Sequence, residues 1–306
     1  MNALPAPLRR PRLLIVGCGD VGLRVVRLLA PRWQMLALTS SPGRVADLRA
    51  AGVTPLLGNL DDPASLRRLA GLADTVLHLA PPARTGLADT RTRALIAALQ
   101  RGAAPACLIY ASTTGVYGDC AGEAVTEART PAPSSARAHR RADAEAVVRA
   151  WGRRQGVRVC VLRIPGIYAL DRAGGDPRDR VRAGLPMLRA ADDVFTNHVH
   201  ADDLARACAL ALWRGLPQRA FNLCDDGRSL SGDWFDTIAD AAGLARPPRI
   251  TREQAQATLG AMRLSFLSES RQVDNGRAKT ELRWRLRFPT VASALADERA
   301  QKSAPA

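Results

Sequence analysis

A glycine-rich hexapeptide near the start of the chain, G-x-G-x-x-G at residues 17–22, constrains the fold most. It overlaps the end of an apolar run, Leu13–Gly17, that predicts a buried strand. The residues after it place apolar side chains at helical spacing: Val21, Val25, Leu28 and Leu29. In such a strand–loop–helix unit Gly17 permits the tight turn, Gly19 lets the backbone approach a pyrophosphate, and Gly22 lets helix and strand pack closely. The loop therefore predicts a dinucleotide site at a helix N-terminus, with a tight turn that binds nothing as the alternative.

The first half of the chain alternates short apolar runs with helical patterns, which is typical of parallel βαβ units. Strands are expected at Leu13–Gly17, Gln34–Thr39, Val53–Leu57, Thr75–Leu79, Ala106–Tyr110 and Arg158–Ile164. Ser41-Pro42 and Asp62-Pro63 predict helix starts, and a long helix is expected over residues 135–151. The pattern predicts an α/β protein with a doubly wound parallel sheet, the Rossmann fold.

After residue 168 the periodicity breaks up, and residues 170–193 are rich in Gly, Pro, Asp and Arg. We therefore expect a dinucleotide-binding domain over residues 1–168 and a small, trimmed C-terminal substrate lobe over 169–306. A strong amphipathic pattern within about 196–215 predicts a segment that returns to the Rossmann domain.

The net charge of +15 raises the question of nucleic-acid binding. Only two of the 44 basic residues are lysines, Lys279 and Lys302, and the arginines are spread along the whole chain. Aromatic residues make up 4% of the chain, too few for a platform on which single-stranded bases stack. We therefore expect no dedicated nucleic-acid binding, although phosphates and other anionic ligands are attracted.

Three further features indicate a cytoplasmic protein without a metal site. The basic N-terminus lacks the apolar segment of a secretory signal. No apolar run approaches the roughly 20 residues that span a membrane, so no membrane partner is expected. The six cysteines include no CxxC pair, which argues against a disulfide framework and against zinc.

The type of dinucleotide is indicated about 20 residues after the glycine loop, where NAD sites usually carry an acidic residue for the ribose hydroxyls. Here the chain has Thr39, Ser40 and Ser41, followed by Arg44. No carboxylate stands there to repel a 2′-phosphate, and Arg44 is placed to pair with one. This favours NADP over NAD, unless Arg44 is simply solvated on its helix.

Several later motifs occur in a characteristic order. They are Gly58–Asp62 (GNLDD), His78–Ala80 (HLA), Ser112–Gly118 (STTGVYG), Arg163–Tyr168 (RIPGIY), Val199–Ala205 (VHADDLA) and Asp274–Trp284. Together with the glycine loop, they resemble the extended short-chain dehydrogenase/reductase family, also called the NAD-dependent epimerase/dehydratase family. The resemblance implies an NAD(P)-binding oxidoreductase or epimerase-like enzyme. With the glycine loop, it assigns the cofactor to Gly17, Gly19, Asp20, Val21, Gly22, Thr39, Ser40, Arg44, Asn59, Leu60, Leu79, Ala80, Pro81 and Pro165.

The family's chemistry uses a Ser or Thr, a Tyr, and a Lys four residues after that Tyr. The resemblance places the hydroxyl at Thr113, next to Ser112, but the Tyr and Lys positions fall on Arg137 and Arg141. Neither lysine of the chain lies near this helix in sequence, so the usual acid–base pair is absent and the active site is atypical. Arginine cannot shuttle the proton, because its pKa stays far above neutral.

Each substituted position leaves two interpretations open. Arg141 either holds the ribose hydroxyls as the lysine does, or forms an i,i+4 ion pair with Glu145. Arg137 either binds an anionic substrate group or, as we favour, faces solvent. Tyr117, His139, His198 and His200 are better explained as packed or structural groups than as catalysts, with Asp202 capping the helix after His200.

Few residues separate Tyr168 from His200, where sugar-nucleotide enzymes of the family carry a longer insertion. This trimmed lobe argues for a small-molecule substrate, or for none. The alternative function is a non-catalytic dinucleotide-binding protein that reports redox state to a partner. By resemblance, residues 91–100 and 135–151 are expected to form a homodimer interface.

Overall fold

The computed structural model describes residues 10–30, 32–260, 264 and 267–303. Within them, a seven-stranded parallel sheet has the order β12-β7-β5-β4-β1-β2-β3. Its strands are β1 (Arg12–Val16), β2 (Gln34–Thr39), β3 (Thr54–Leu57), β4 (Thr75–His78), β5 (Cys107–Thr113), β7 (Arg158–Ile164) and β12 (Arg219–Asn222). The predicted doubly wound α/β fold is confirmed, and β12 extends the sheet beyond the six strands predicted for the first half.

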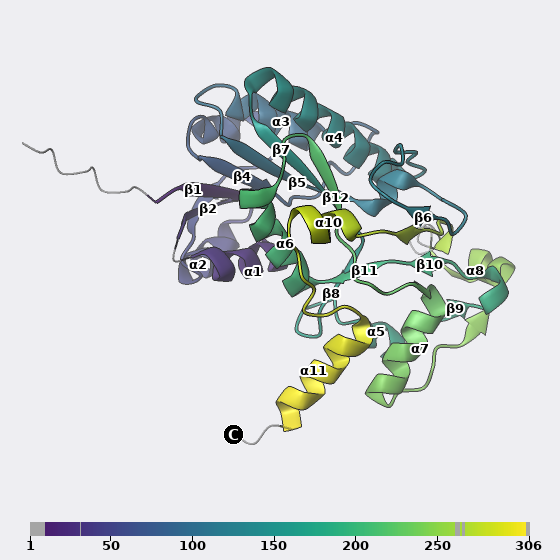
Figure 1. Cartoon of the computed structure of the whole chain (residues 1–306). Coiled ribbons are helices and arrows are strands. Elements are labelled where there is room, and N and C mark those ends of the chain that lie inside the picture. The colour runs from purple at the N-terminus through teal and green to yellow at the C-terminus, as the bar shows by residue number, and fades with distance from the viewer. Residues whose placement is uncertain (1–9, 31, 261–263, 265–266, 304–306) are drawn as a thin grey trace, which may run out of the picture.

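Helices cover both faces of this sheet (Figure 1). One face carries α1 (Asp20–Leu29), α2 (Val45–Ala50) and α6 (Ala201–Arg214), and the other carries α3 (Thr90–Leu99) and α4 (Ala136–Gln155). Contacts between α1 and α6, and between α3 and α4, tie each layer together. Because both faces are covered, the strands are apolar throughout rather than alternating with polar residues.

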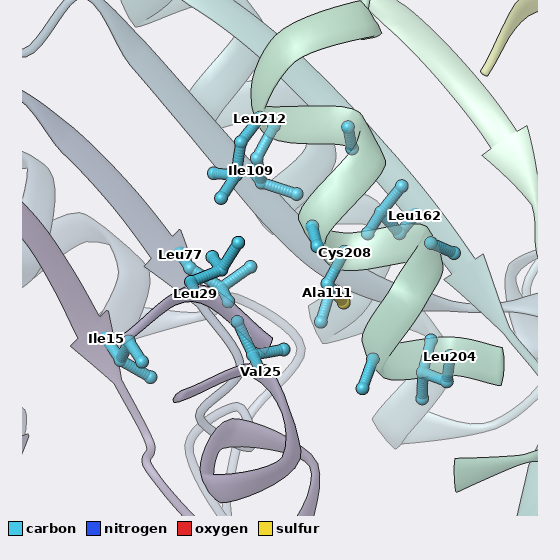
Figure 2. Close-up of a cluster of buried hydrophobic side chains, with 14 of the residues drawn as sticks. Ile15, Val25, Leu29, Leu77, Ile109, Ala111, Leu162, Leu204, Cys208 and Leu212 are labelled. Atoms are coloured by element: carbon cyan, nitrogen blue, oxygen red, sulfur yellow. The ribbon is translucent and has the colours of Figure 1, made fainter. Parts of the chain in front are cut away.

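The alternation of side chains along β1 divides the core into two clusters. Leu13 and Ile15 face the layer of α1 and α6, whereas Leu14 and Val16 face the layer of α3 and α4. Figure 2 shows the first cluster, in which Ile15 lies with Val25 of α1 and with residues of the sheet and of α6. Burial of these side chains anchors the helix that follows the glycine loop.

Helices were predicted to start at the Ser-Pro and Asp-Pro pairs, and in the structure each pair begins a 3₁₀ element. Pro42–Arg44 forms a 3₁₀ turn (η1) before α2, and Pro63–Leu69 is a 3₁₀ helix (η2) capped by the Asp62 side chain. The long helix α4 extends beyond the predicted end at residue 151. It continues to Gln155, where Gly156 closes it in a left-handed conformation with φ of +66°.

The remaining elements include those that build a small lobe, whereas α10 (Gly276–Glu281) packs against β12 of the sheet. They are η3 (Thr114–Tyr117), β6 (Ala124–Val125), β8 (Gly166–Tyr168), α5 (Pro177–Arg182), β9 (Met187–Leu188), η4 (Ala190–Asp192), β10 (Phe195–Thr196), β11 (His198–His200), β13 (Ser229–Leu230), α7 (Ser231–Ala242), β14 (Arg249–Ile250), α8 (Arg252–Thr258), β15 (Gln272–Val273), α10 (Gly276–Glu281) and α11 (Val291–Ser303). The lobe has a core of its own, formed largely by aromatic and aliphatic residues of α7 and α11.

Several segments after residue 168 contribute to the core of the large sheet. Leu204 and Cys208 of α6, Phe221 of β12, and Trp284 all belong to the cluster on the α1 face. The division of the chain at residue 168 stays a prediction. Among the described residues, no helix is both long and apolar enough to cross a membrane.

Candidate functional site

The glycine loop has the geometry that dinucleotide binding requires. Gly17 has φ of +89°, and a Cβ there would lie 2.5 Å from the backbone nitrogen of Ala80. At Gly19, by contrast, a Cβ would meet no atom within 4 Å, so the space beside this residue is open. Gly19 is the N-cap residue of α1, and the first backbone N–H groups of the helix are available to an anion beside it.

Two cavities adjoin this loop and share Gly17, Gly19 and Leu79 in their walls. They lie at the carboxyl ends of the strands where the chain order changes direction, between β1 and β4. In doubly wound sheets this switch point is where ligands bind. The larger cavity has a volume of about 540 Å³ and the smaller one about 230 Å³.

The larger cavity extends from the glycine loop over β2 and β3. The residues predicted for the cofactor that line it are Gly17, Gly19, Thr39, Ser40, Arg44, Asn59, Leu60, Leu79, Ala80 and Pro81. Its charged lining residues are Arg44, Arg84 and Arg91, so no carboxylate is among the described residues of this wall. Arg91 is already paired with Asp61 at 2.5 Å, which leaves Arg44 and Arg84 as the cations better placed for a ligand.

Arg44 is held near the cavity by two weak interactions. One guanidinium nitrogen donates to the Cys18 carbonyl over 3.3 Å, and Nε lies 3.6 Å from an Asp47 carboxylate oxygen. The Asp47 side chain is 70% exposed, so solvent screens this ion pair. Arg84 was missed by the sequence analysis, because no local pattern indicates which loop residues line a cavity in the folded chain.

The smaller cavity lies over the ends of β5 and β7. The predicted residues that line it are Gly17, Gly19, Asp20, Val21, Gly22, Leu79, Ser112, Thr113, Arg141 and Pro165. It therefore brings together all three residues predicted for catalysis. Arg137 lines it too, as do Ala111, Ile164, Ile167, Arg172 and Leu204.

The two hydroxyl groups at the end of β5 have different surroundings. Ser112 is buried and donates its hydroxyl proton to Glu145 Oε1 over 2.6 Å. Thr113 Oγ1 instead accepts a 3.2 Å hydrogen bond from the Gly115 backbone N–H. Because the Thr113 oxygen is the acceptor there, its proton remains available to donate to a group in the cavity.

Arg141 is buried and held by neutral acceptors. It donates to the carbonyls of Ala111 at 2.7 Å and Ala80 at 3.2 Å, and to the Tyr110 hydroxyl at 3.1 Å. Among the described residues it forms no ion pair with Glu145, which pairs with Arg163 instead. The predicted alternative of an i,i+4 ion pair is therefore wrong.

Arg137 occupies the second residue of α4, and its side chain is exposed in the open cleft. It nevertheless lines the smaller cavity. Partial burial, followed by the positive charges of Arg141 and Arg140, lowers the pKa of the Arg137 guanidinium. Facing solvent and lining the cavity are thus compatible for the Arg137 side chain, which does both.

A comparison with sequence families shows to which family this chain belongs. The sequence profile of the NAD dependent epimerase/dehydratase family matches residues 13–224. The chain belongs to that family. The expectation from the sequence motifs is therefore confirmed, and no curated protein gives a significant match.

Solved structures share the fold along nearly the whole chain. A conserved protein of unknown function from Silicibacter pomeroyi is 28% identical, with a TM-score of 0.80 and coverage of 96% of this chain and 100% of that one. UDP-glucose 4-epimerase from Thermotoga maritima, solved with UDP-glucose, is 20% identical, with a TM-score of 0.74 over 95% of this chain and 100% of that one. A dTDP-glucose 4,6-dehydratase from Streptomyces venezuelae, solved with NAD, is 21% identical, with a TM-score of 0.74 over 95% and 98% of the two chains.

Within this family member, no tyrosine, lysine or histidine is among the described residues that line the two cavities. Tyr117 is buried, and its hydroxyl donates to Asn222 Oδ1 over 2.7 Å. His198 stacks on Trp234 with ring centroids 3.7 Å apart. His200, rather than the predicted Asp202, is the N-cap residue of α6.

The one carboxylate in the wall of the smaller cavity, among the described residues, is Asp20. Arg24 Nε lies 3.1 Å from Asp20 Oδ2, and Arg172 Nε lies 3.4 Å from the same oxygen. The Asp20 carboxylate is thus already engaged by two guanidinium groups. The described lining of the smaller cavity thus offers hydroxyl groups, several guanidinium groups and the paired Asp20, but no tyrosine, lysine or histidine to act as general acid.

The described cysteines are all free and buried. Burial raises the pKa of the Cys18 thiol, which lies in the glycine loop, to about 11. No cluster of His, Cys, Asp or Glu within the described part of the chain is arranged to hold a metal ion.

Proposed function

We propose that the chain binds NADP in the two adjoining cavities and acts on a small molecule as an atypical oxidoreductase or epimerase-like enzyme. The observation that carries the proposal is the continuity of the cavities. They share the open glycine loop, and Thr113 lines one of them. A bound nicotinamide cofactor supplies hydride transfer, and its pyrophosphate fits the space beside Gly19.

The residues of the larger cavity support NADP over NAD. The 2′-phosphate that distinguishes NADP carries negative charge, and the charged residues among the described lining of this cavity are arginines rather than carboxylates. Arg44 is the main candidate to bind this phosphate. Its bond to the Cys18 carbonyl positions it near the glycine loop, and its exposed pair with Asp47 is weak enough to be replaced.

In the smaller cavity Thr113 orients the substrate, and Arg141 stabilises the backbone around it. Thr113 donates a hydrogen bond to a substrate carbonyl without giving up its proton, while its oxygen accepts the Gly115 N–H. Arg141 holds the ends of β4 and β5 through carbonyl oxygens and presents its guanidinium to the cofactor's ribose. Because the described residues that line this cavity include no tyrosine, lysine or histidine, water or the substrate supplies the proton.

Titration of the purified protein with NADPH and with NADH, followed by nicotinamide fluorescence, tests the cofactor site. We expect tighter binding of NADPH, lost in Gly19→Asp, which places a charged side chain in the pyrophosphate space. Turnover is tested with a panel of small aldehydes and ketones, with Thr113→Ala as the variant. Absence of binding by both nucleotides overturns the proposal.

The lack of a tyrosine, lysine or histidine among the described residues of both cavity walls favours a second candidate, a non-catalytic dinucleotide-binding protein that reports redox state to a partner. This function predicts tight NADPH binding without oxidation of the cofactor across the whole panel. It further predicts a partner contact that changes between NADPH and NADP⁺. Measurable turnover that Thr113→Ala abolishes excludes it.

We also propose a homodimer formed through α3 and α4, which lie side by side on one face of the sheet (Figure 1). Light scattering coupled to size-exclusion chromatography tests this directly. A monomer at micromolar concentration overturns it. A cytoplasmic location stays a prediction.

A further inference from the structure

Arg137 differs from the two arginines that follow it on α4. Arg140 donates to the Gly86 carbonyl at 2.6 Å, and Arg141 donates to the carbonyls of Ala111 and Ala80. Arg137 has neither a hydrogen bond nor an ion pair with any residue that the structure describes. Among these three arginines, it is thus the one that makes no hydrogen bond to a described residue, so all of its donors remain free for a ligand in the smaller cavity.

The position of Arg137 is also electrostatically unfavourable without a ligand. It lies in the first turn of a 20-residue helix, where the helix dipole disfavours a cation, and that turn contains no acidic residue. Arg140 and Arg141 are its i+3 and i+4 neighbours, so like charges face it along the helix. An anion in the cavity relieves both effects at once.

The phosphates of the dinucleotide do not account for this site. The pyrophosphate is expected at the loop that follows β1, whereas Arg137 shares its part of the cavity wall with Thr113, which ends β5, and with Pro165, which follows β7. In the sheet β4 separates β5 from β1, so the ends of these two strands lie about 10 Å apart at roughly 4.8 Å per strand. The 2′-phosphate site proposed above lies farther away, over β2.

We propose that the substrate carries an oxyanion group, a carboxylate or a phosphate, that Arg137 binds while Thr113 contacts its reacting carbonyl. This inference rests on the proposed function, because it concerns the substrate end of the same cleft. A guanidinium group binds either oxyanion through two parallel hydrogen bonds, which fixes the orientation of a small molecule. Arg137 thereby provides substrate specificity at a position that in the family holds the catalytic tyrosine.

Matched pairs of small aldehydes test the inference. Glyoxylate and glycolaldehyde differ in a carboxylate, and glyceraldehyde 3-phosphate and glyceraldehyde differ in a phosphate. Calorimetry measures their binding to protein saturated with NADP⁺, which cannot reduce them, and to cofactor-free protein. The variants are Arg137→Gln, Arg137→Lys, and the control Arg154→Gln, which removes an exposed arginine at the other end of the same helix.

We expect at least one charged aldehyde to bind more tightly than its neutral partner. Arg137→Gln should weaken that binding about 10- to 100-fold, the effect of one charge-assisted contact, without changing the affinity for the neutral aldehydes. Arg137→Lys should restore part of it and Arg154→Gln should leave it intact. The preferred pair decides between carboxylate and phosphate.

Three outcomes overturn the inference. The first is that the preference for charged aldehydes survives in Arg137→Gln. The second is that no charged aldehyde is preferred although NADP⁺ binds. The third is that Arg137→Gln weakens the binding of NADP⁺ and leaves the binding of the aldehydes unchanged. If NADP⁺ fails to bind at all, the proposed cofactor site is wrong. The measurements on cofactor-free protein then test the anion site separately. They show whether the charged aldehydes bind more tightly than the neutral ones and whether this difference depends on Arg137.

Discussion

Glu145 of α4 and Arg163 of β7 form an ion pair in the protein interior, with 2.8 Å between Oε2 and Nη2 and only 5% of each side chain exposed. Glu145 also accepts the Ser112 hydroxyl proton, and Arg163 donates to the Tyr117 hydroxyl over 2.9 Å. The pair thus connects α4 to the ends of β5 and β7, the strands that carry the smaller cavity. Ser112 belongs to this structural network, which leaves Thr113 as the hydroxyl free to contact a substrate.

Removing one partner of this pair should strongly destabilise the fold. Glu145→Ala leaves the buried guanidinium of Arg163 without a counter-ion, and we expect the free energy of unfolding to fall by about 3–5 kcal/mol. Urea denaturation measures the change. Glu123→Ala is the matched control, because Glu123 pairs with Arg129 at 2.7 Å with 65% of its side chain exposed, and should cost at most about 1 kcal/mol. Equal effects of the two variants would contradict the structural role of the buried pair.

The first two glycines of the loop should respond differently to alanine. Gly17→Ala is disfavoured in the folded state twice, by the positive φ and by a Cβ 2.5 Å from the Ala80 nitrogen, so we expect a clear fall in thermal stability. In Gly19→Ala the added methyl group meets no atom within 4 Å, so the free energy of unfolding should stay within about 1 kcal/mol of the wild-type value. It should nevertheless weaken NADPH binding, because its methyl group occupies the approach to the pyrophosphate. Undiminished NADPH affinity in Gly19→Ala would place the dinucleotide elsewhere.

Arg44 should determine the preference between the two nicotinamide dinucleotides. Arg44→Ala removes the cation nearest the loop after β2, and we expect NADPH affinity to fall about tenfold while NADH affinity changes little. Fluorescence titration of both nucleotides gives the ratio. Arg49→Ala removes an exposed arginine of α2 outside the cavity wall and serves as the charge-matched control. A parallel loss for both nucleotides in Arg44→Ala would show that this residue does not recognise the 2′-phosphate.

A buried carboxyl group in the loop after β12 should make stability depend on pH. Asp225 is 5% exposed, and its Oδ2 atom has no hydrogen-bond partner among the described residues. Burial raises the pKa of this carboxyl from 3.8 to about 8. The folded state therefore keeps the proton between about pH 4 and pH 8, whereas the unfolded chain has released it. Stability should fall as the pH rises through this window and level off above pH 8.

Asp225→Asn removes the titration while keeping an acceptor for the Gly227 backbone N–H. We expect this variant to be more stable than the wild type at pH 8, by roughly a few kcal/mol, with a much smaller difference at pH 4. Urea denaturation across this range gives the two curves. Asp226→Asn is the control, because Asp226 is more exposed and pairs with Lys279, and it should show no gain at pH 8. Parallel curves for wild type and Asp225→Asn would mean that Asp225 is ionised in the native protein.

Much of the fold could be predicted from local patterns. The glycine loop at residues 17–22 and the apolar run before it define a strand, a turn and a helix, because backbone conformation and side-chain periodicity are properties of neighbouring residues. The same patterns predicted β7 at Arg158–Ile164 with its observed bounds. They could not predict that α4 continues to Gln155, because helix ends depend on packing and on the conformation of Gly156.

The sequence by itself determined the family, the dinucleotide loop and the absence of the usual Tyr-x-x-x-Lys pair, since each is a matter of residue type and spacing. Only the tertiary structure decided which polar groups face the cleft. It turned the hydroxyl of Ser112 toward Glu145, left that of Thr113 available, and placed Arg137 and Arg172 in one cavity wall. The physical reason is that strand order and burial bring together side chains far apart in the chain. Whether a charged group is paired or free depends on those neighbours.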